Sequence, residues 1–413
     1  MQIRSVSAYG AYYSTTLPAG GGFQSSPTSL PSDLGVGGSA EIRWATSGEH
    51  STFSLTYTPS YTGRVRYSSV NALNHALSLN ATSKVAPRWS LGFSLNGNLS
   101  TIEQFLFSPT AFSNAASVSA SFNDLSGAML AGRSTNTELA SALSTATLVE
   151  SPVSALLYGQ RMFTSAMQTS VAYSHSPRLS VTFSGGATRS QRVADSSVVQ
   201  NLSLLPTTTS GNASVAISYS LSPQTQIGGS VTSSRFSSSL YDGYTTASTA
   251  SLGRTLGQHW FWQIHGGIGV MNPLRQISIP PTGRHPVAGG SLGFRTFSHT
   301  LLGSYDRTAG DSYGLGVSTT SSATATWRFS RPGSGWWLTG AFSWQRMEGT
   351  ALTNTTGWRT TAGFGRALGA HLAWQTEYAY LNYSGSFSSA AYSGSQSAVR
   401  VSLVWTAQPA LAR

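Results

Sequence analysis

The chain has 413 residues, no cysteine and a net charge of +11, but only 9% of its residues are charged and 39% are hydrophobic. Soluble domains carry about 25% charged residues, so this composition excludes an ordinary solvated surface and also a large apolar core. No apolar run reaches the length of about 18 residues that a membrane-spanning helix needs. The composition instead favours a closed β-barrel, with an apolar outer belt around an uncharged polar lining.

The start of the chain, Met1 to Ser5, lacks the apolar stretch of a signal peptide. Because export would require one, we expect a processed chain, a misassigned start or a barrel cut from a longer protein. Lys84 is the only lysine among 24 basic residues, and the arginines are scattered singly rather than clustered. Nucleic-acid-binding proteins concentrate Lys and Arg in patches, so we predict no nucleic-acid partner.

Apolar and polar residues alternate with a period of two along the chain, as in 89–99, 53–57, 215–221, 336–344 and 399–405. Such alternation predicts strands whose two faces meet different solvents. We find no long amphipathic helix. About eighteen strands are predicted, at 2–13, 39–46, 51–61, 73–83, 89–101, 160–174, 178–187, 212–221, 225–236, 244–255, 260–271, 286–297, 299–307, 316–329, 335–345, 356–366, 371–382 and 396–405.

The predicted connections alternate between short and long along the chain. The short ones include three turns centred on Pro87, Pro177 and Pro223, where proline presets a turn dihedral. Short turns on one rim and long loops on the other are typical of outer-membrane barrels, whose short turns are periplasmic. An even number of strands then leaves both termini on the short-turn side, so we predict an all-β, antiparallel up-and-down barrel of about 18 strands, with 16 as the alternative.

Tryptophans fall at the ends of the predicted strands rather than at their centres. Indole side chains favour the boundary between membrane and water, where barrels carry aromatic girdles. A soluble β-sandwich would place tryptophan in its core, and a β-solenoid would need a short repeat that is absent. The predicted membrane-interface belt comprises Trp44, Trp89, Trp260, Trp262, Trp327, Trp336, Trp374 and Trp405 at the short-turn rim, with Trp337 beside them, and Trp344 and Trp358 at the other rim.

The closing stretch 397–405 alternates apolar residues and ends in Trp405, which resembles the terminal-strand signal of bacterial outer-membrane barrels; here eight residues, Thr406 to Arg413, follow it. The chain as a whole resembles porin-type or polysaccharide-export barrels. That resemblance implies the bacterial outer membrane, contact with its lipid and lipopolysaccharide, and a channel for passive diffusion of small polar or anionic solutes. It leaves two alternatives: an exopolysaccharide secretion channel working with periplasmic export components, or a structural or adhesive surface barrel with a closed lumen.

The connection at about 102–159 is much the longest, and it is rich in Ala, Leu and Phe. Loops of this length are usually functional or disordered. In porins, which the chain resembles, the third outer loop folds into the lumen and narrows it. A lid over the mouth or a disordered loop are the alternatives. The same segment carries four acidic residues: Glu103, Asp124, Glu138 and Glu150.

Alternation along the strands points five arginines into the lumen: Arg43, Arg295, Arg328, Arg359 and Arg400. They lie on the second, twelfth, fourteenth, sixteenth and eighteenth predicted strands, which form one wall when the barrel closes. We hypothesise that the acidic loop faces this basic wall across a constriction and that the pore prefers anions, because charged walls set ion preference. The equally weighted alternative is local pairing of these arginines with Glu41, Asp306 or Glu377.

Enzyme motifs are weak. The stretch Gly289-Gly290-Ser291-Leu292-Gly293 has the spacing of a nucleophile elbow, but it lies inside an alternating strand instead of at a strand–turn–helix junction. His299 and Asp306 lie at opposite ends of one predicted strand, about 23 Å apart, so they form no catalytic pair. The histidines show no metal-ligand spacing. We therefore predict no catalysis, no metal and no cofactor.

Overall fold

The computed structural model describes residues 2–14, 32–66, 71–101, 161–193, 207–239, 241–257, 259–276, 283–311, 317–331, 333–349, 352–387 and 390–407. Every regular element among them is a strand, and none is a helix long and apolar enough to cross a membrane. The predicted long loop at 102–159, with Glu103, Asp124, Glu138 and Glu150, lies outside the described residues. The strands are β1 (Gln2–Tyr13), β2 (Asp33–Ser47), β3 (Ser51–Arg64), β4 (Ala72–Ala86), β5 (Trp89–Thr101), β6 (Arg161–Ser174), β7 (Leu179–Arg192), β8 (Thr208–Ser222), β9 (Thr225–Ser238), β10 (Tyr241–Leu256), β11 (Trp260–Gln276), β12 (Gly283–Arg295), β13 (His299–Asp311), β14 (Val317–Ser330), β15 (Trp336–Gly349), β16 (Leu352–Ala367), β17 (Leu372–Phe387) and β18 (Ala390–Thr406).

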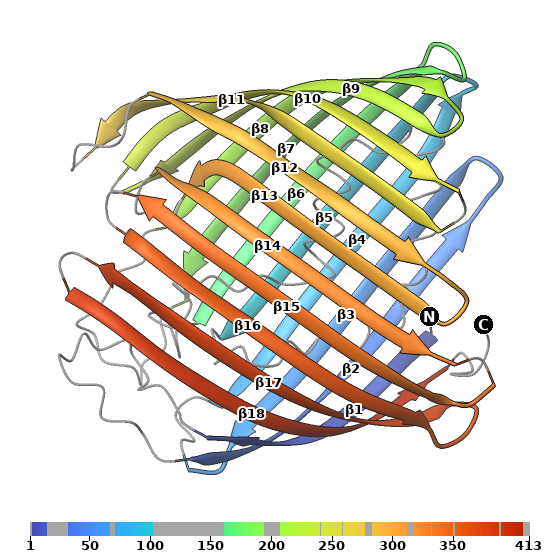
Figure 1. Ribbon diagram of the computed structural model, residues 1–413, viewed down its shortest axis with the longest axis vertical. Helices are drawn as coiled ribbons and strands as arrows, with labels where there is room; N and C mark the ends of the chain where they lie inside the picture. Colours follow the sequence, from blue (N-terminus) through green and yellow to red (C-terminus); the bar gives the residue numbers. More distant parts are fainter. Residues whose placement is uncertain are drawn as a thin grey trace.

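The eighteen strands form one antiparallel sheet that closes on itself (Figure 1). Each strand pairs with its neighbours in the sequence, and β1 closes the barrel by pairing with both β2 and β18. β1 begins and β18 ends at the rim that carries the short turns (Figure 1). The prediction of an all-β, up-and-down barrel is confirmed, with 18 strands rather than the alternative 16.

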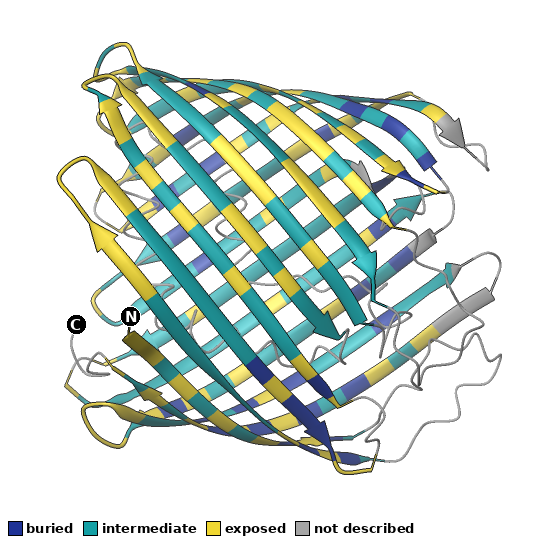
Figure 2. Ribbon diagram, turned by 180° about the vertical axis from the view of Figure 1, so that it is seen from behind, coloured by how far each residue is buried: buried dark blue, intermediate teal, exposed yellow. Residues whose placement is uncertain are grey.

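The two faces of the wall have different compositions because side chains alternate along each strand. On β1, Val6 and Tyr12 point outward and are 42% and 47% exposed, whereas Ala11 and Tyr13 point inward and are 6% and 4% exposed. The register pairs outward residues with outward ones, as in Val6 with Trp405. Figure 2 shows this alternation as exposed and less exposed bands along the strands.

Several strands extend past their predicted ends on the long-loop side. β2 begins at Asp33 rather than at 39, β18 begins at Ala390 rather than at 396, and β3 ends at Arg64 rather than at 61. Outside the hydrocarbon layer both faces of a strand meet water or polar groups, so the alternation that marks a strand in the sequence fades. The hydrogen-bonded ladder continues past that point.

Two of the three proline-centred turns, at Pro177 and Pro223, are capped by the serine that precedes the proline. Ser176 Oγ accepts hydrogen bonds from the backbone N–H groups of Arg178 and Leu179, at 3.2 and 3.1 Å. Ser222 Oγ does the same for the N–H of Gln224 at 3.2 Å. In these two turns the serine before the proline therefore bonds donors of the tight turn. In the turn after β10, Gly257 has a φ of 63°, which favours glycine.

Candidate functional site

The five arginines that the sequence directs inward all lie at inward-facing positions. Arg400 on β18 is 1% exposed, and it shares the inward face with Ala398 and Ser402, which are equally buried. The other four pair across the ladder with inward residues: Arg43 with Thr56, Arg295 with Thr300, Arg328 with Thr339, and Arg359 with Ser343.

Three of these arginines, with a fourth that the sequence analysis missed, occupy one continuous line of cross-strand pairs. The line starts at Arg295 near the short-turn rim and ends at Arg64 near the long-loop rim. We call Arg295, Arg328, Arg400 and Arg64 the arginine row. Its members are joined through the successive paired residues Arg295, Thr300, Arg328, Thr339, Gly363, Glu377, Arg400, Ala11, Gly35 and Arg64.

The arginine row runs from one rim to the other because the strands of a barrel are tilted and a line of ladder pairs is perpendicular to them. It crosses nine strand-to-strand steps, which correspond to about 43 Å along the sheet. Arg359 lies off this line, four residues nearer the long-loop rim than Gly363 on the same strand, and Arg43 lies off it on β2. The predicted basic wall is therefore a diagonal track with two outlying members.

The most buried part of the row is an ion pair between β17 and β18. Arg400 Nη2 donates to Glu377 Oε2 at 3.1 Å, with side-chain exposures of 1% and 10%. The Arg400 guanidinium also lies 5.3 Å from the ring centre of Tyr9, and the Arg64 guanidinium stacks 3.4 Å above the ring of Tyr13. Of the two hypotheses for the inward arginines, a basic wall or local pairing with carboxylates, local pairing therefore holds for Arg400. Glu41 instead pairs with Arg4 at 3.2 Å.

Glycines at inward positions make room for these large side chains. A Cβ atom on Gly37 would clash with the Tyr9 ring, and one on Gly35 would lie 3.0 Å from the Tyr13 ring. With no side chain there, Tyr9 reaches across β2 and its hydroxyl hydrogen-bonds Thr62 Oγ1 at 2.9 Å. Glycines in β2 are therefore what allow the aromatic rings to lie along the wall beneath the arginines.

A second inward pair spans β12 in the same way. His265 Nε2 on β11 lies 3.1 Å from Asp306 Oδ1 on β13, directly over Gly289, whose missing Cβ would contact both. Asp306 was weighed as a partner for an arginine, and its described partner is this histidine. His299 lies on the outward face against Trp327, whereas Asp306 faces inward, so the two residues do not form a pair. The Gly289–Gly293 motif lies within β12, as the alternation indicates.

The opposite arc of the wall, β5 to β10, is lined by hydroxyl and amide groups. Ser180 pairs with Ser218 at 2.6 Å, and Ser230 pairs with Thr249 at 2.8 Å. Among the described inward positions of these six strands, Arg192 at the loop end of β7 is the one charged residue. The lumen thus has a basic arc and an uncharged hydroxyl arc.

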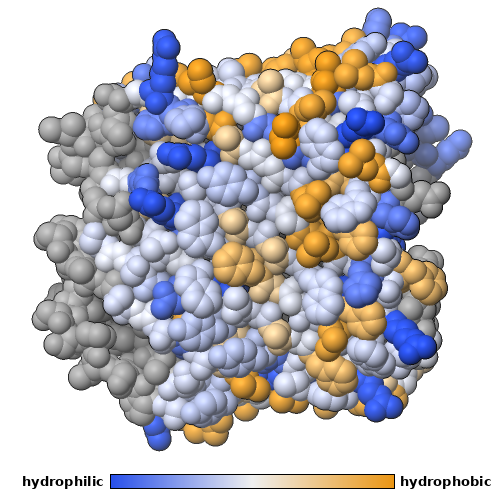
Figure 3. Space-filling model, viewed as in Figure 1, coloured by the Kyte–Doolittle hydropathy of each residue, from blue (hydrophilic) through white to orange (hydrophobic). Residues whose placement is uncertain are grey.

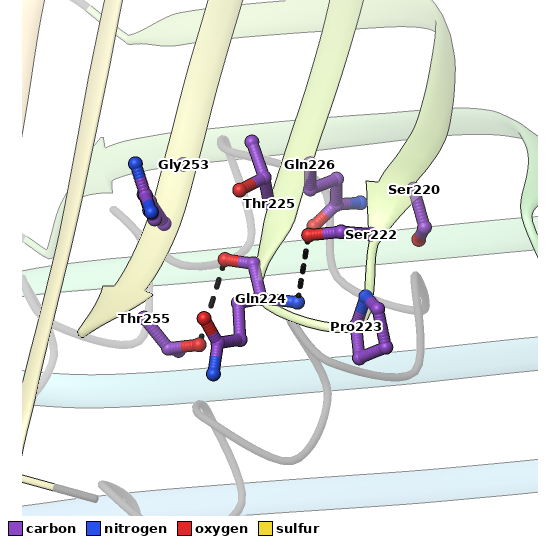
Figure 4. A pocket seen from close by; sticks show the side chains of 9 residues that line it. Ser220, Ser222, Pro223, Gln224, Thr225, Gln226, Gly253 and Thr255 are labelled. Carbon is purple, nitrogen blue, oxygen red and sulfur yellow. Dashed lines mark hydrogen bonds between the residues drawn. The ribbon is translucent and has the colours of Figure 1, made fainter. Parts of the chain in front are cut away.

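A shallow pocket lies at the short turn between β8 and β9 (Figure 4). Its polar groups already serve the turn, because Gln224 N–H donates to Ser222 Oγ and Thr255 Oγ1 donates to the Gln224 carbonyl at 3.5 Å (Figure 4). We therefore infer that these groups stabilise the turn and do not bind a ligand.

Ten tryptophans face outward. They lie at two levels, eight towards the short turns and Trp344 and Trp358 towards the long loops, and several stack on other aromatic rings, such as Trp358 on Tyr380 at 5.1 Å. On the β11–β18 side, hydrophilic side chains lie towards the two rims and apolar ones between them (Figure 3). A closed wall with an apolar exterior, aromatic girdles and a polar interior is the geometry of a bilayer-spanning barrel.

The chain folds as a closed 18-stranded β-barrel whose apolar outer face suits a bilayer. Trp337 differs from its neighbours in the barrel's girdle: it points inward and lies over Gly365. It therefore belongs to the lumen wall, at the short-turn rim where the sequence places it. The ten outward tryptophans are Trp44, Trp89, Trp260, Trp262, Trp327, Trp336, Trp344, Trp358, Trp374 and Trp405.

No protein-family model and no curated protein sequence matches the barrel. Among solved structures, it is similar to OccK2 (OpdF) from Pseudomonas aeruginosa in complex with glucuronate, at 10% identity and a TM-score of 0.45, covering 98% of each chain. It is similar to OccK1 (OpdK) from the same organism, at 10% identity and a TM-score of 0.44, covering 98% of this chain and 97% of that one. The siderophore receptor PirA matches at 8% identity and a TM-score of 0.39, covering 98% and 80%.

Proposed function

We propose that this barrel is a water-filled channel through which small polar solutes cross the outer membrane, with a preference for anions. The observation that carries the proposal is the set of inward, partly exposed arginines Arg43, Arg295, Arg328 and Arg359, since Arg400 and Arg64 are buried within the wall. These guanidinium groups, at separate places on the lumen wall, give a passing anion several separate binding sites. Conduction requires such multiple sites that are individually weak enough to release the solute.

The electrostatic balance of the lumen supports this direction of selectivity. Seven inward arginines face four inward carboxylates among the described residues, and each carboxylate has a partner. Glu377 binds Arg400, Glu41 binds Arg4 and Asp306 binds His265. Asp33 accepts the backbone N–H groups of Leu34 and Arg66. The remaining field of the wall is positive, which raises the local concentration of anions.

The hydroxyl arc supports a polar rather than an apolar solute. Its Ser and Thr side chains hydrogen-bond one another, as in Ser184 with Ser214 at 2.5 Å, and each hydroxyl still has acceptor capacity. A solute with its own hydroxyl groups can replace these contacts at little cost. We keep the solute class at small polar or anionic molecules.

The proposal is tested by the reversal potential of the refolded barrel in a planar bilayer under a KCl gradient. We expect the sign that corresponds to chloride, with a shift towards zero in the double variant Arg295→Gln/Arg328→Gln. Arg254→Gln is the matched control, because Arg254 lies near the same rim on the outward face. Cation preference in the unmodified barrel, an equal shift in the control, or a barrel without conductance would each overturn the proposal.

A further inference from the structure

The outward face of β13 to β16 changes character sharply near the long-loop rim. One line of ladder pairs, Tyr305, Ala323, Trp344 and Trp358, is mostly aromatic. The next outward line, two residues closer to the loops, is Arg307, Ser321, Arg346 and Thr356. These two lines lie about 7 Å apart. Aromatic residues mark the edge of the hydrocarbon, so the arginines lie at the level of the lipid headgroups.

Within the second line, Arg307 and Arg346 flank Ser321 on the strand between them. Their strands are separated by two ladder steps, about 9–10 Å, and Ser321 contributes only a small hydroxyl side chain to the space between. Arg346 is exposed. The Nε atom of Arg307 is buried and has no hydrogen-bond partner among the described residues. Two guanidinium groups on either side of a hydroxyl donor form a receptacle for a tetrahedral anion.

The Glu348 carboxylate lies next to these two arginines. Glu348 Oε1 lies 2.7 Å from Arg346 Nη2, so Arg346 is engaged by its neighbour two residues along β15. The group of Arg307, Arg346 and Glu348 keeps a net positive charge. Another outward arginine of this rim, Arg235, differs because Asp242 neutralises it at 3.3 Å.

We propose that Arg307, Ser321 and Arg346 form a binding site for a phosphate group of lipopolysaccharide in the outer leaflet. The location assigns the source: the site faces away from the lumen, next to the aromatic edge of the membrane, on the rim with the long loops. Arginine recognises phosphate through paired, charge-assisted hydrogen bonds. The acyl chains of the same lipid lie against the apolar wall beneath Tyr305 and Trp344. The site is independent of what the lumen conducts.

The test uses native mass spectrometry of the detergent-solubilised barrel with three probes: bisphosphorylated lipid A, enzymatically dephosphorylated lipid A and inorganic phosphate, all with a chelator present. We expect retention of the bisphosphorylated lipid. Arg307→Gln/Arg346→Gln should weaken that retention about tenfold or more, since each hydrogen bond to a charged group contributes strongly. Arg235→Gln, on the same rim, should leave it within about twofold, because its charge is already neutralised. Heat-modifiable migration in gels verifies that each variant is folded.

A further variant separates ligand binding from a merely structural ion pair. Glu348→Gln removes the carboxylate that competes with phosphate for Arg346, so it should tighten retention of the bisphosphorylated lipid. Equal retention of the dephosphorylated lipid would overturn phosphate recognition. Binding of inorganic phosphate as tight as that of the lipid would overturn the assignment to a lipid. Unchanged retention in the double arginine variant, or weaker retention in Glu348→Gln, would overturn the site itself.

Discussion

The Glu377→Gln substitution tests how much the buried ion pair between Glu377 and Arg400 stabilises the barrel. Glu377 and Arg400 are 8% and 1% exposed and lie 3.1 Å apart, and Arg359 interacts electrostatically with both. The neutral amide removes the carboxylate that pairs with the buried Arg400 charge among the described residues. Breaking a buried ion pair from one side costs about 3–5 kcal/mol of unfolding free energy, because one charge is left without water or a counter-ion. A second guanidinium nearby makes the upper part of that range appropriate.

The assay is equilibrium unfolding in urea of the barrel refolded into lipid vesicles, followed by tryptophan fluorescence. Arg400→Gln should also destabilise the barrel, since it leaves Glu377 buried without its partner. The double variant Glu377→Gln/Arg400→Gln should be more stable than the sum of the single effects predicts, with a coupling free energy of about 2 kcal/mol. A loss below about 1 kcal/mol in Glu377→Gln, or strictly additive single effects, would refute the buried-pair reasoning.

Other parts of the wall give simpler expectations. Gly37→Val should cost about 1–3 kcal/mol in the same unfolding measurement, because its side chain displaces the Tyr9 ring. Gly10→Val, at a position with open space around it, should cost much less, and equal losses would contradict the role of Gly37. Deletion of 102–159 should raise single-channel conductance if that segment narrows the lumen. An unchanged conductance would favour a lid or a disordered loop instead.

The number of strands and the direction of their side chains were predictable because both are local. Side chains alternate between hydrocarbon and water along each strand, so alternation located the strands and the inward direction of Arg400. The alternation of short and long connections favoured eighteen strands over sixteen. The ends of the strands were less predictable. Arg64 lies at the loop end of β3, where Thr62, Gly63 and Arg64 show no apolar–polar alternation, so the sequence suggested a loop.

Contacts between strands were not predictable from the sequence because they depend on register. Glu377 meets Arg400, and His265 meets Asp306, only after the alignment of neighbouring strands is fixed. A one-residue shift in any strand would move a side chain to the other face. An indirect signal was present nonetheless: glycines at inward positions, such as Gly37 and Gly289, mark places where a large side chain from a neighbouring strand lies along the wall.

Cysteine accessibility tests the central claim most directly, because the natural chain contains no cysteine. Thr324 and Ala325 are adjacent on β14 and face opposite sides, inward with Ser304 and outward with Gly303. A charged, membrane-impermeant thiol reagent should react with Thr324→Cys in vesicles and lower the single-channel conductance, while Ala325→Cys stays unmodified within the lipid. Reaction at Ala325→Cys, with Thr324→Cys protected and conductance unaffected, would contradict a lipid-facing exterior around a water-filled lumen.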